Sequence, residues 1–453
     1  MIICSIILKS QLEGAHRIDA EYYQPEYLVF GKKLKAIGEV SLGKLAFITD
    51  GQHGYHIVDP LSSIRHLTAK SVSHWLVNDD GADRLAEETN RKNLRSALEF
   101  GDILISTAGT IGSVGIVSDD VLPANIDQDV ARVHIHDQSL IDPFFLIAFL
   151  NSKFGQFQIE RETTGQIQTH IALEKIKNRL FISIPKWQGL IADLVKQGLR
   201  SCNDSKNLYS QAVVLLLSEL GLTDFEEHAG LFGIVRFSEV RAAERIDADY
   251  FDPKFRKLFS AIQRHQPAKL GDLVTMKKGV EPGSEAYEEG DKLFIRVSNL
   301  SKEGLTDNSQ KYLSEKLYQE LRKDYEPKEG EILLSKDATP GIAYVLKESV
   351  KGINSGGIMR LKIKNEEVDP EYLALCINSI IGQMQAKRDA GGSIIQHWKP
   401  EQIKNVLVPL LPLPVQQQIS ALVRQSHEAR RKSKALLEDA KRKVEEEIEK
   451  QTI

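Results

Sequence analysis

The sequence predicts an α+β protein with two pseudo-repeated globular domains, separated by a pair of long antiparallel coiled-coil helices. Three observations support this prediction: an internal repeat, short strand-like runs mixed with helical segments in each copy, and a long apolar helical pattern after each copy. A chain of 453 residues also exceeds what one ordinary hydrophobic core holds, which agrees with more than one domain.

The repeat keeps a nearly constant spacing along the chain. Arg-Ile-Asp-Ala-Glu-Tyr-Tyr at 17–23 returns as Arg-Ile-Asp-Ala-Asp-Tyr-Phe at 245–251, an offset of 228 residues. Gly-Asp-Ile-Leu-Ile-Ser at 101–106 returns as Gly-Glu-Ile-Leu-Leu-Ser at 330–335, an offset of 229. Solenoid units are much shorter, about 20–50 residues. The spacing therefore predicts a duplicated domain with two related surfaces, which suits a long ligand with two separated marks.

The order of elements is the same in both copies. We expect one domain at 1–185 and the other at 229–412, with helical segments at 186–228 and 413–453. Each domain shows β-type runs, such as 102–106 and 293–297, and a helix that begins at a proline, at 143–152 and 370–379. A last strand ends before Pro185 and Pro412. The apolar start of the chain, residues 1–8, aligns with Gly233-Ile234-Val235 and predicts a strand.

The helical segments at 190–219 and 414–449 carry apolar residues at steps of three and four among charged ones. This narrow stripe is typical of a coiled-coil seam. Neither helix buries such a stripe alone, so we favour an antiparallel pair that holds the two domains apart. The alternative is two independent helices, each packed on its own domain.

Composition narrows the possible classes of protein. The chain is 42% hydrophobic and 27% charged, as in ordinary soluble proteins, and no apolar run reaches the roughly 18 residues of a membrane helix. Its three cysteines show no disulfide or zinc spacing, which favours a reducing cytoplasm and no metal site. The net charge of −4 argues against a protein that coats nucleic acid, but it leaves room for a local basic groove.

No catalytic motif is present in the sequence. GxGxxG opening a helix, GxxxxGK[ST], HExxH and GxSxG are missing, and so is the Asn- or Asp-Pro-Pro-Tyr element that adenine methylation requires. The glycine-rich stretch 109–115 keeps one glycine in the second copy, so we interpret it as a tight turn between strands. The sequence therefore predicts a non-catalytic protein.

Candidate binding residues cluster in matching loops of the two copies. Reading base edges requires side chains with forked donors and acceptors, such as Arg, Lys, Asn and Gln. For any single one of them, an ordinary solvated loop position is the alternative interpretation. The candidates in the first copy are Gln52, His53, Thr68, Lys70, Thr107, Thr110, Asn125, Gln128, Gln166 and Gln168. Those in the second copy are Lys277, Lys278, Arg296, Asn299, Lys336, Thr339, Asn354, Ser393 and Gln396.

The duplicated order of segments resembles the specificity subunit of Type I restriction–modification enzymes. The resemblance covers nearly the whole chain. It rests on the repeated turn at 17–23, on Gly-Asp-Ile-Leu-Ile-Ser-Thr-Ala-Gly-Thr-Ile-Gly at 101–112, and on Leu-Leu-Ser-Lys-Asp-Ala-Thr-Pro-Gly-Ile-Ala at 333–343. Ile-Lys-Asn at 176–178 and 403–405, each followed by a proline and a long helix, adds to it.

The resemblance implies a function and a set of partners. Each domain would recognise one half of a split site in double-stranded DNA, and the paired helices would measure the unread spacer. The same helices would dock two modification (methyltransferase) subunits, and restriction (motor-nuclease) subunits would join for cleavage. S-adenosylmethionine, ATP and Mg are expected on those partners and no cofactor on this chain.

One difference between the copies bears on the DNA site. Asp127-Gln128-Asp129 in the first copy corresponds in sequence to Ser355-Gly356-Gly357 in the second, so the two half-sites are expected to differ. A second hypothesis is a two-domain protein-binding scaffold of a related DNA-defence complex, with little base readout.

Overall fold

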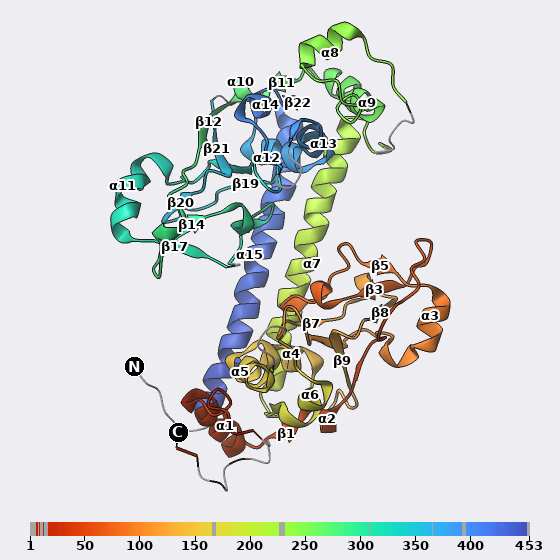
Figure 1. Cartoon of the computed structure of the whole chain (residues 1–453), viewed down its shortest axis with the longest axis vertical. Helices are drawn as coiled ribbons and strands as arrows, with labels where there is room; N and C mark the ends of the chain where they lie inside the picture. Colours follow the sequence, from red (N-terminus) through yellow and green to blue (C-terminus); the bar gives the residue numbers. More distant parts are fainter. Residues whose placement is uncertain are drawn as a thin grey trace. The chain divides into compact units, whose positions relative to one another are not determined.

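The chain folds into two compact units. The computed structural model describes residues 6–7, 9, 12, 17–164, 169–225, 232–307, 309–364, 366–391 and 396–450. Unit 1 is made of residues 1–202 and 431–453, and unit 2 is made of residues 203–430. Each unit therefore contains one globular domain, one stretch of helix α7 (Gln188–Glu219) and one stretch of helix α15 (Leu413–Lys450) (Figure 1).

The main sheet of unit 1 has the strand order β2-β9-β6-β7-β4, with antiparallel neighbours except for the parallel pair β4 and β7. Ile48 lies opposite Val133 and Ile105 opposite Ala131, and all four side chains are buried. Helix α4 packs on β7 and completes this core. The bounds are β2 (Ala46–Asp50), β9 (Val130–Ile135), β6 (Ile103–Ser106), β7 (Val114–Ile116), β4 (Trp75–Leu76) and α4 (Pro143–Asn151).

A smaller sheet of unit 1 has the order β5-β3-β8, in which β3 and β8 are parallel. Its buried face forms a separate apolar cluster that includes Leu67 and Ile126. The bounds of this sheet are β5 (Asp83–Arg84), β3 (Arg65–Leu67) and β8 (Ala124–Ile126). The remaining elements are α1 (Pro25–Ile37), β1 (Val40–Ser41), α2 (Leu42–Leu45), α3 (Glu87–Lys92), α5 (Lys153–Glu162), α6 (Leu173–Arg179) and β10 (Phe181–Ile182).

Unit 2 has a similar arrangement, but among the described residues its main sheet has four strands and no parallel edge strand. Its main sheet, β12-β21-β18-β19, is antiparallel, and its second sheet, β13-β17-β14-β20, again contains one parallel pair, β14 and β20. The main-sheet bounds are β12 (Val274–Lys278), β21 (Ile358–Ile363), β18 (Ile332–Ser335) and β19 (Ala343–Val345). The second sheet is made of β13 (Tyr287–Glu288), β17 (Lys311–Leu313), β14 (Lys292–Ile295) and β20 (Gly352–Asn354). The other elements are α8 (Phe237–Ala243), α9 (Pro253–Gln263), β11 (Ala268–Lys269), α10 (Leu270–Leu273), β15 (Leu300–Ser301), β16 (Gly304–Leu305), α11 (Glu315–Tyr325), α12 (Pro370–Asn378), α13 (Ile380–Asp389), α14 (Pro400–Lys404) and β22 (Leu407–Val408).

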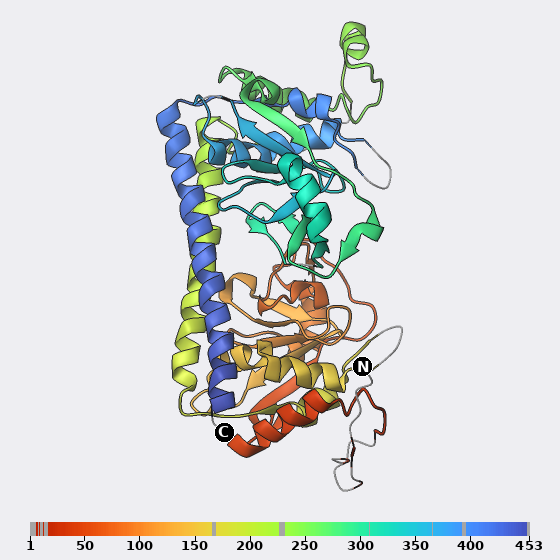
Figure 2. The same cartoon turned by 90° about the vertical axis from the view of Figure 1, so that its left-hand side faces the viewer.

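In each unit, a stretch of α7 lies along a stretch of α15 (Figure 2). In unit 1, Val195 of α7 shares the core with Val444 of α15. In unit 2, Leu216 of α7 shares the core with Ile419 of α15. The predicted antiparallel pair is thus confirmed within each unit. The alternative, in which each helix packs on its own domain, also holds in part, because the paired stretches pack on the domain cores as well.

Two expectations about apolar segments were wrong. Gly233, Ile234 and Val235 lie in no strand, and neither do Ile6 and Ile7. Ile6 and Ile234 are exposed, so no sheet edge covers them; the other residues of 1–8 lie outside the described part of the chain. Leu190, expected in the apolar stripe of the first helix, is also exposed. Among the described residues, no helix is long and apolar enough to cross a membrane.

Candidate nucleic-acid interface

Four loops of unit 1 meet at one edge, which we name the loop edge of unit 1. Gly51 donates its backbone N–H to the carbonyl of Asp127 at 3.0 Å, and Thr107 donates to the carbonyl of Asp129 at 2.8 Å. Because β3 and β8 are parallel, their carboxyl ends send two of the loops to the same place. The loops follow β2, β3, β6 and β8, at residues 51–53, 68–71, 107–110 and 127–129.

Unit 2 has an equivalent loop edge. Gly356 donates its N–H to the carbonyl of Val280 at 3.0 Å, and Lys336 donates to the carbonyl of Gly357 at 2.9 Å. The parallel strands β14 and β20 play the part of β3 and β8. The loops follow β12, β14, β18 and β20, at residues 279–281, 296–299, 336–341 and 355–357.

A glycine allows the loops to converge in both units. A Cβ on Gly51 would lie 1.7 Å from the carbonyl oxygen of Ile126, and a Cβ on Gly279 would lie 2.1 Å from that of Ser355. No other residue type permits these approaches without a backbone shift. The two glycines are 228 residues apart, so the same close packing is built twice.

Several candidates of the first copy lie at the surface of the loop edge. Lys70 and Gln128 are exposed, and within the described part of the chain their side chains have no partner. His53 is exposed, with its Nε2 2.9 Å from Asp50 Oδ2. Thr110 is exposed and donates its hydroxyl to the carbonyl of Ala69 at 3.2 Å.

The other candidates of the first copy are buried, half-buried or outside the described residues. Thr107 and Asn125 are 3% and 1% exposed, so neither presents its side chain to a ligand. The Asn125 amide donates to Asn90 Oδ1 at 2.8 Å and accepts from the N–H of Ile126 at 2.8 Å. Gln52 and Thr68 are half-buried. Gln166 and Gln168 lie outside the described residues.

The candidates of the second copy divide in the same way. Lys278, Thr339 and Gln396 are exposed, and the Lys278 ammonium has no partner among the described residues. Lys277 is exposed but paired with Asp324 Oδ1 at 2.7 Å. The half-buried Arg296 guanidinium donates to the carbonyl of Ser309. Asn299, Lys336 and Asn354 are buried, and Ser393 lies outside the described part of the chain.

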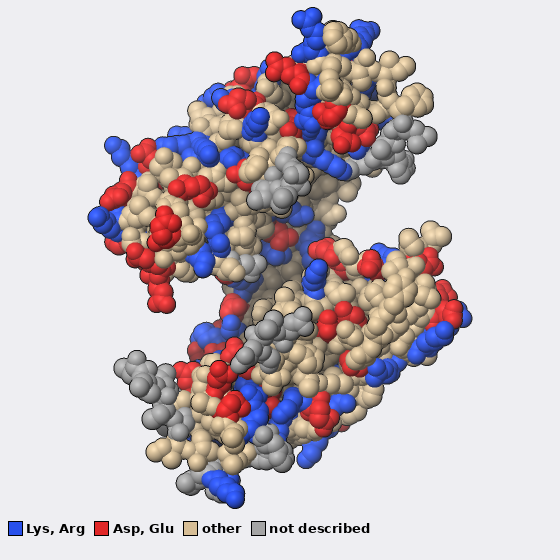
Figure 3. Space-filling view, viewed as in Figure 1, with Lys and Arg blue, Asp and Glu red and all other residues tan. Residues whose placement is uncertain are grey.

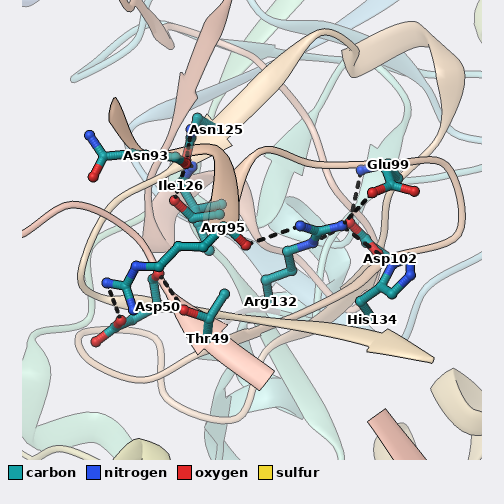
Figure 4. Close-up of polar contacts among 11 residues, drawn as sticks. Thr49, Asp50, Asn93, Arg95, Glu99, Asp102, Asn125, Ile126, Arg132 and His134 are labelled. Atoms are coloured by element: carbon teal, nitrogen blue, oxygen red, sulfur yellow. Dashed lines mark hydrogen bonds and ion pairs between the residues drawn. The ribbon is translucent and has the colours of Figure 1, made fainter. Parts of the chain in front are cut away.

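Arg95 lies outside the four loops but contacts the loop edge of unit 1 at the carbonyl of Gly51. Figure 4 shows it reaching from the segment after α3 to the end of β2. Its guanidinium donates to Thr49 Oγ1 and to Asp50 Oδ1, each at 3.0 Å. Burial favours the neutral form of Asp50, but the hydrogen bond from His53 and the charge of Arg95 together lower its pKa. No sequence pattern marks Arg95 among the other loop cations.

The ionised form of the Asp127 carboxylate destabilises the folded state, because the side chain is partly buried. Burial raises its pKa to about 6, and the nearby charge of Asp129 adds to the shift. Since the pKa is higher in the folded state than in the unfolded chain, stability falls as the pH rises from about 4 to 6 and stays reduced above that range. A residue kept at a loop edge despite such a penalty is a candidate for binding.

We expect Asp127→Asn to stabilise unit 1 by about 1 kcal/mol at pH 7.5, a value reduced because the side chain is only half-buried. The Asn side-chain oxygen keeps the acceptor for the N–H of Asp129, now 3.0 Å from Asp127 Oδ1. At pH 4 the advantage should vanish. Thermal unfolding as a function of pH measures it, with the exposed Asp80→Asn as control. An equal advantage at both pH values would contradict the titration of Asp127.

Comparisons with known proteins find similarity to one family. Residues 264–434 match the family model of the Type I restriction modification DNA specificity domain. Over 114 residues the chain is 29% identical to the Type I restriction enzyme EcoBI specificity subunit of Escherichia coli. That match covers 24% of this chain and 23% of the relative, so it spans about a quarter of each.

The matches to solved structures are more distant in sequence. The S subunit of a Type I restriction-modification system from M. genitalium matches with a TM-score of 0.42 and 14% identity, over 92% of this chain and 96% of that one. The HsdS subunit from Thermoanaerobacter tengcongensis matches with a TM-score of 0.28 and 15% identity, over 92% and 96%.

The family-model match indicates the class of domain. Within residues 264–434, the chain is similar to the DNA specificity domain of Type I restriction–modification systems. The resemblance that the sequence predicts, to the specificity subunits of Type I restriction–modification enzymes, is thereby confirmed.

Proposed function

We propose that this chain is the DNA-recognition subunit of a Type I restriction–modification complex and reads an asymmetric, bipartite site. The observation that carries the proposal is the DNA specificity domain at 264–434, whose loop edge recurs 228 residues earlier in unit 1. Two loop edges of one design suit two half-sites. Loops on a rigid sheet framework are where binding residues commonly lie.

The side chains at the two edges are different, which is why the site is proposed to be asymmetric. At the offset of 228 residues, Asp127 and the exposed Gln128 of unit 1 correspond to the buried Ser355 and to Gly356 of unit 2. Asp50 at the end of β2 corresponds to the exposed Lys278 at the end of β12. Carboxylate and amide groups accept from or pair with the amino groups of cytosine and adenine, and cations favour guanine or phosphate. Different side chains therefore select different bases.

Catalysis is assigned to partner chains. Modification subunits would supply S-adenosylmethionine and the methyl-transfer site, and motor-nuclease subunits would supply ATP hydrolysis, Mg and DNA cleavage. The chain's own part is to bind DNA and to dock those subunits. Sequencing the methylated sites of a host that expresses this chain with its modification subunit tests the proposal. The expected result is one split site with two unlike halves; methylation without sequence preference would contradict it.

Lys278 provides a test at a single side chain. We expect Lys278→Ala to weaken DNA binding several-fold for all sequences alike, and to lower the slope of log K against log salt by about one, because a phosphate contact releases a counterion. The neighbouring Lys277→Ala is the matched control, since Asp324 already neutralises Lys277. Binding titrations at several salt concentrations measure both. Equal effects of the two substitutions would contradict the role of Lys278.

One observation favours the alternative, a protein-binding scaffold. On the face shown in Figure 3, Lys and Arg side chains are interspersed with Asp and Glu in each unit. A nucleic-acid surface more often carries clustered cations. The same methylation experiment separates the two functions, because a scaffold with little base readout directs no sequence-specific methylation.

A further inference from the structure

The repeated turn at 17–23 and 245–251 has the same internal geometry in both units. Arg17 forms a two-pronged ion pair with Asp19, at 2.8 and 2.8 Å, and Arg245 forms the same pair with Asp247, at 2.7 and 2.8 Å. In each turn the aspartate also accepts from a tyrosine N–H at 3.1 Å. These contacts make each turn a rigid platform.

A tyrosine ring holds each platform to its unit. The Tyr22 ring lies between the guanidinium groups of Arg17 and Arg161, at 4.6 and 4.2 Å. The Tyr250 ring lies between those of Arg245 and Arg388, at 4.6 and 4.8 Å. Cation–π contacts of this kind contribute to local order. The fold therefore explains why arginine, aspartate and tyrosine occur in both copies.

The fold does not explain the isoleucine. Ile18 and Ile246 are 89% and 88% exposed, yet they are identical in both copies. A single exposed apolar residue is ordinary on a protein surface. Leu61 is such a residue: it is 96% exposed, and its counterpart in the second copy is Glu289. An exposed isoleucine kept at one rigid position in both units is different, and it indicates a common use.

The residues beside each isoleucine define the chemistry of the partner. Ala20 with Glu21, and Ala248 with Asp249, are exposed as well. Within the described part of the chain, neither Glu21 nor Asp249 has a partner, so each turn presents an apolar side chain next to an unpaired carboxylate. Such a surface repels phosphate and complements an apolar pocket with a Lys or Arg beside it. The partner is therefore a protein and not DNA.

We propose that these two isoleucine turns are equivalent docking contacts, each for one copy of the same partner chain. The inference rests on the proposed function, in which two copies of the modification subunit bind one recognition chain. Identical turns on units with unlike loop edges fit identical partners with unlike DNA half-sites. The preformed ion pair limits the ordering cost of binding, and the isoleucine acts as the central apolar anchor.

The experiment uses the full chain with the purified modification subunit. Analytical ultracentrifugation gives the number of modification subunits bound, and titration gives the affinity of each site. Ile18→Asp and Ile246→Asp should each weaken one of the two sites by at least about tenfold, and the double variant should weaken both. Ile18→Ala should show a smaller loss at the same site. Leu61→Asp is the control and should leave both sites intact.

The possible outcomes distinguish a failure of the docking contact from a failure of the proposed function. If the wild-type chain binds two modification subunits and the isoleucine variants bind them equally tightly, the docking contact is refuted while the proposed function stands. If the wild-type chain binds none, the proposed function is refuted and this inference with it. Thermal unfolding of each variant should match the wild type, because the substituted side chains are exposed.

Discussion

Replacing residues 1–185 by the corresponding segment of another Type I specificity subunit is expected to change one half of the methylated DNA site and to leave the other half unchanged. The reason is that unit 1 has its own core and its own loop edge. Among the described residues, the side chains of its main apolar cluster all come from 1–202 and 431–453. Sequencing the methylated sites of the hybrid gives the result directly.

The exchange keeps the stretches of α7 and α15 that complete unit 1, and this is what makes it feasible. Val195 and Val444 are fully buried in that unit, so the incoming domain must accept the same apolar helix faces. Exchanging residues 229–412 is the reciprocal control and should change the other half. If either exchange altered both halves, or neither, the assignment of one reader to each unit would be wrong.

The sequence predicts much of the fold because local signals and tertiary structure agree. The Asp-Pro pairs at 142 and 369 mark helix starts, and in the structure Asp142 and Asp369 accept from the N–H groups two residues on, at 2.8 and 2.9 Å. The end of α15 was less predictable. Ala440 and Ile448 belong to the core of unit 1 although they follow the second copy. Periodicity reveals an apolar face but not which core covers it.

The candidate site is harder to predict, since residue type does not reveal depth. Asn125 and Gln128 are both amides and lie three positions apart. Asn125 ends up inside β8 with its amide fully bonded, while Gln128 lies exposed in the turn after that strand. Lys336 and Lys278 differ in the same way, as Lys336 is buried against Asp337 at 2.5 Å. Loop positions on an edge are set by the register of strands, which the sequence pattern leaves open. Which exposed side chains touch bases stays a prediction.

The strongest effect on stability is expected from Asp102→Ala. Asp102 and Arg132 form a buried ion pair with side-chain exposures of 1% and 5%, and Arg132 Nε lies 2.6 Å from Asp102 Oδ2 (Figure 4). The same carboxylate accepts from the N–H of Glu99 at 2.8 Å and lies 2.8 Å from His134 Nδ1. Removing it leaves the buried guanidinium without its main partner, which costs about 3–5 kcal/mol. That is a large part of a domain's total stability of about 5–15 kcal/mol.

The loss should be confined to unit 1, because unit 2 has its own pair. There Arg360 Nη1 lies 3.4 Å from Glu331 Oε2. Glu99→Ala is the matched control: its carboxylate also contacts Arg132, at 3.0 Å, but is 66% exposed, so its removal should cost less than about 1 kcal/mol. Chemical unfolding should show an early transition for Asp102→Ala alone. Binding to DNA that carries only the half-site of unit 2 should persist in that variant. If Asp102→Ala unfolded at the wild-type denaturant concentration, the buried pair would not be holding unit 1 together.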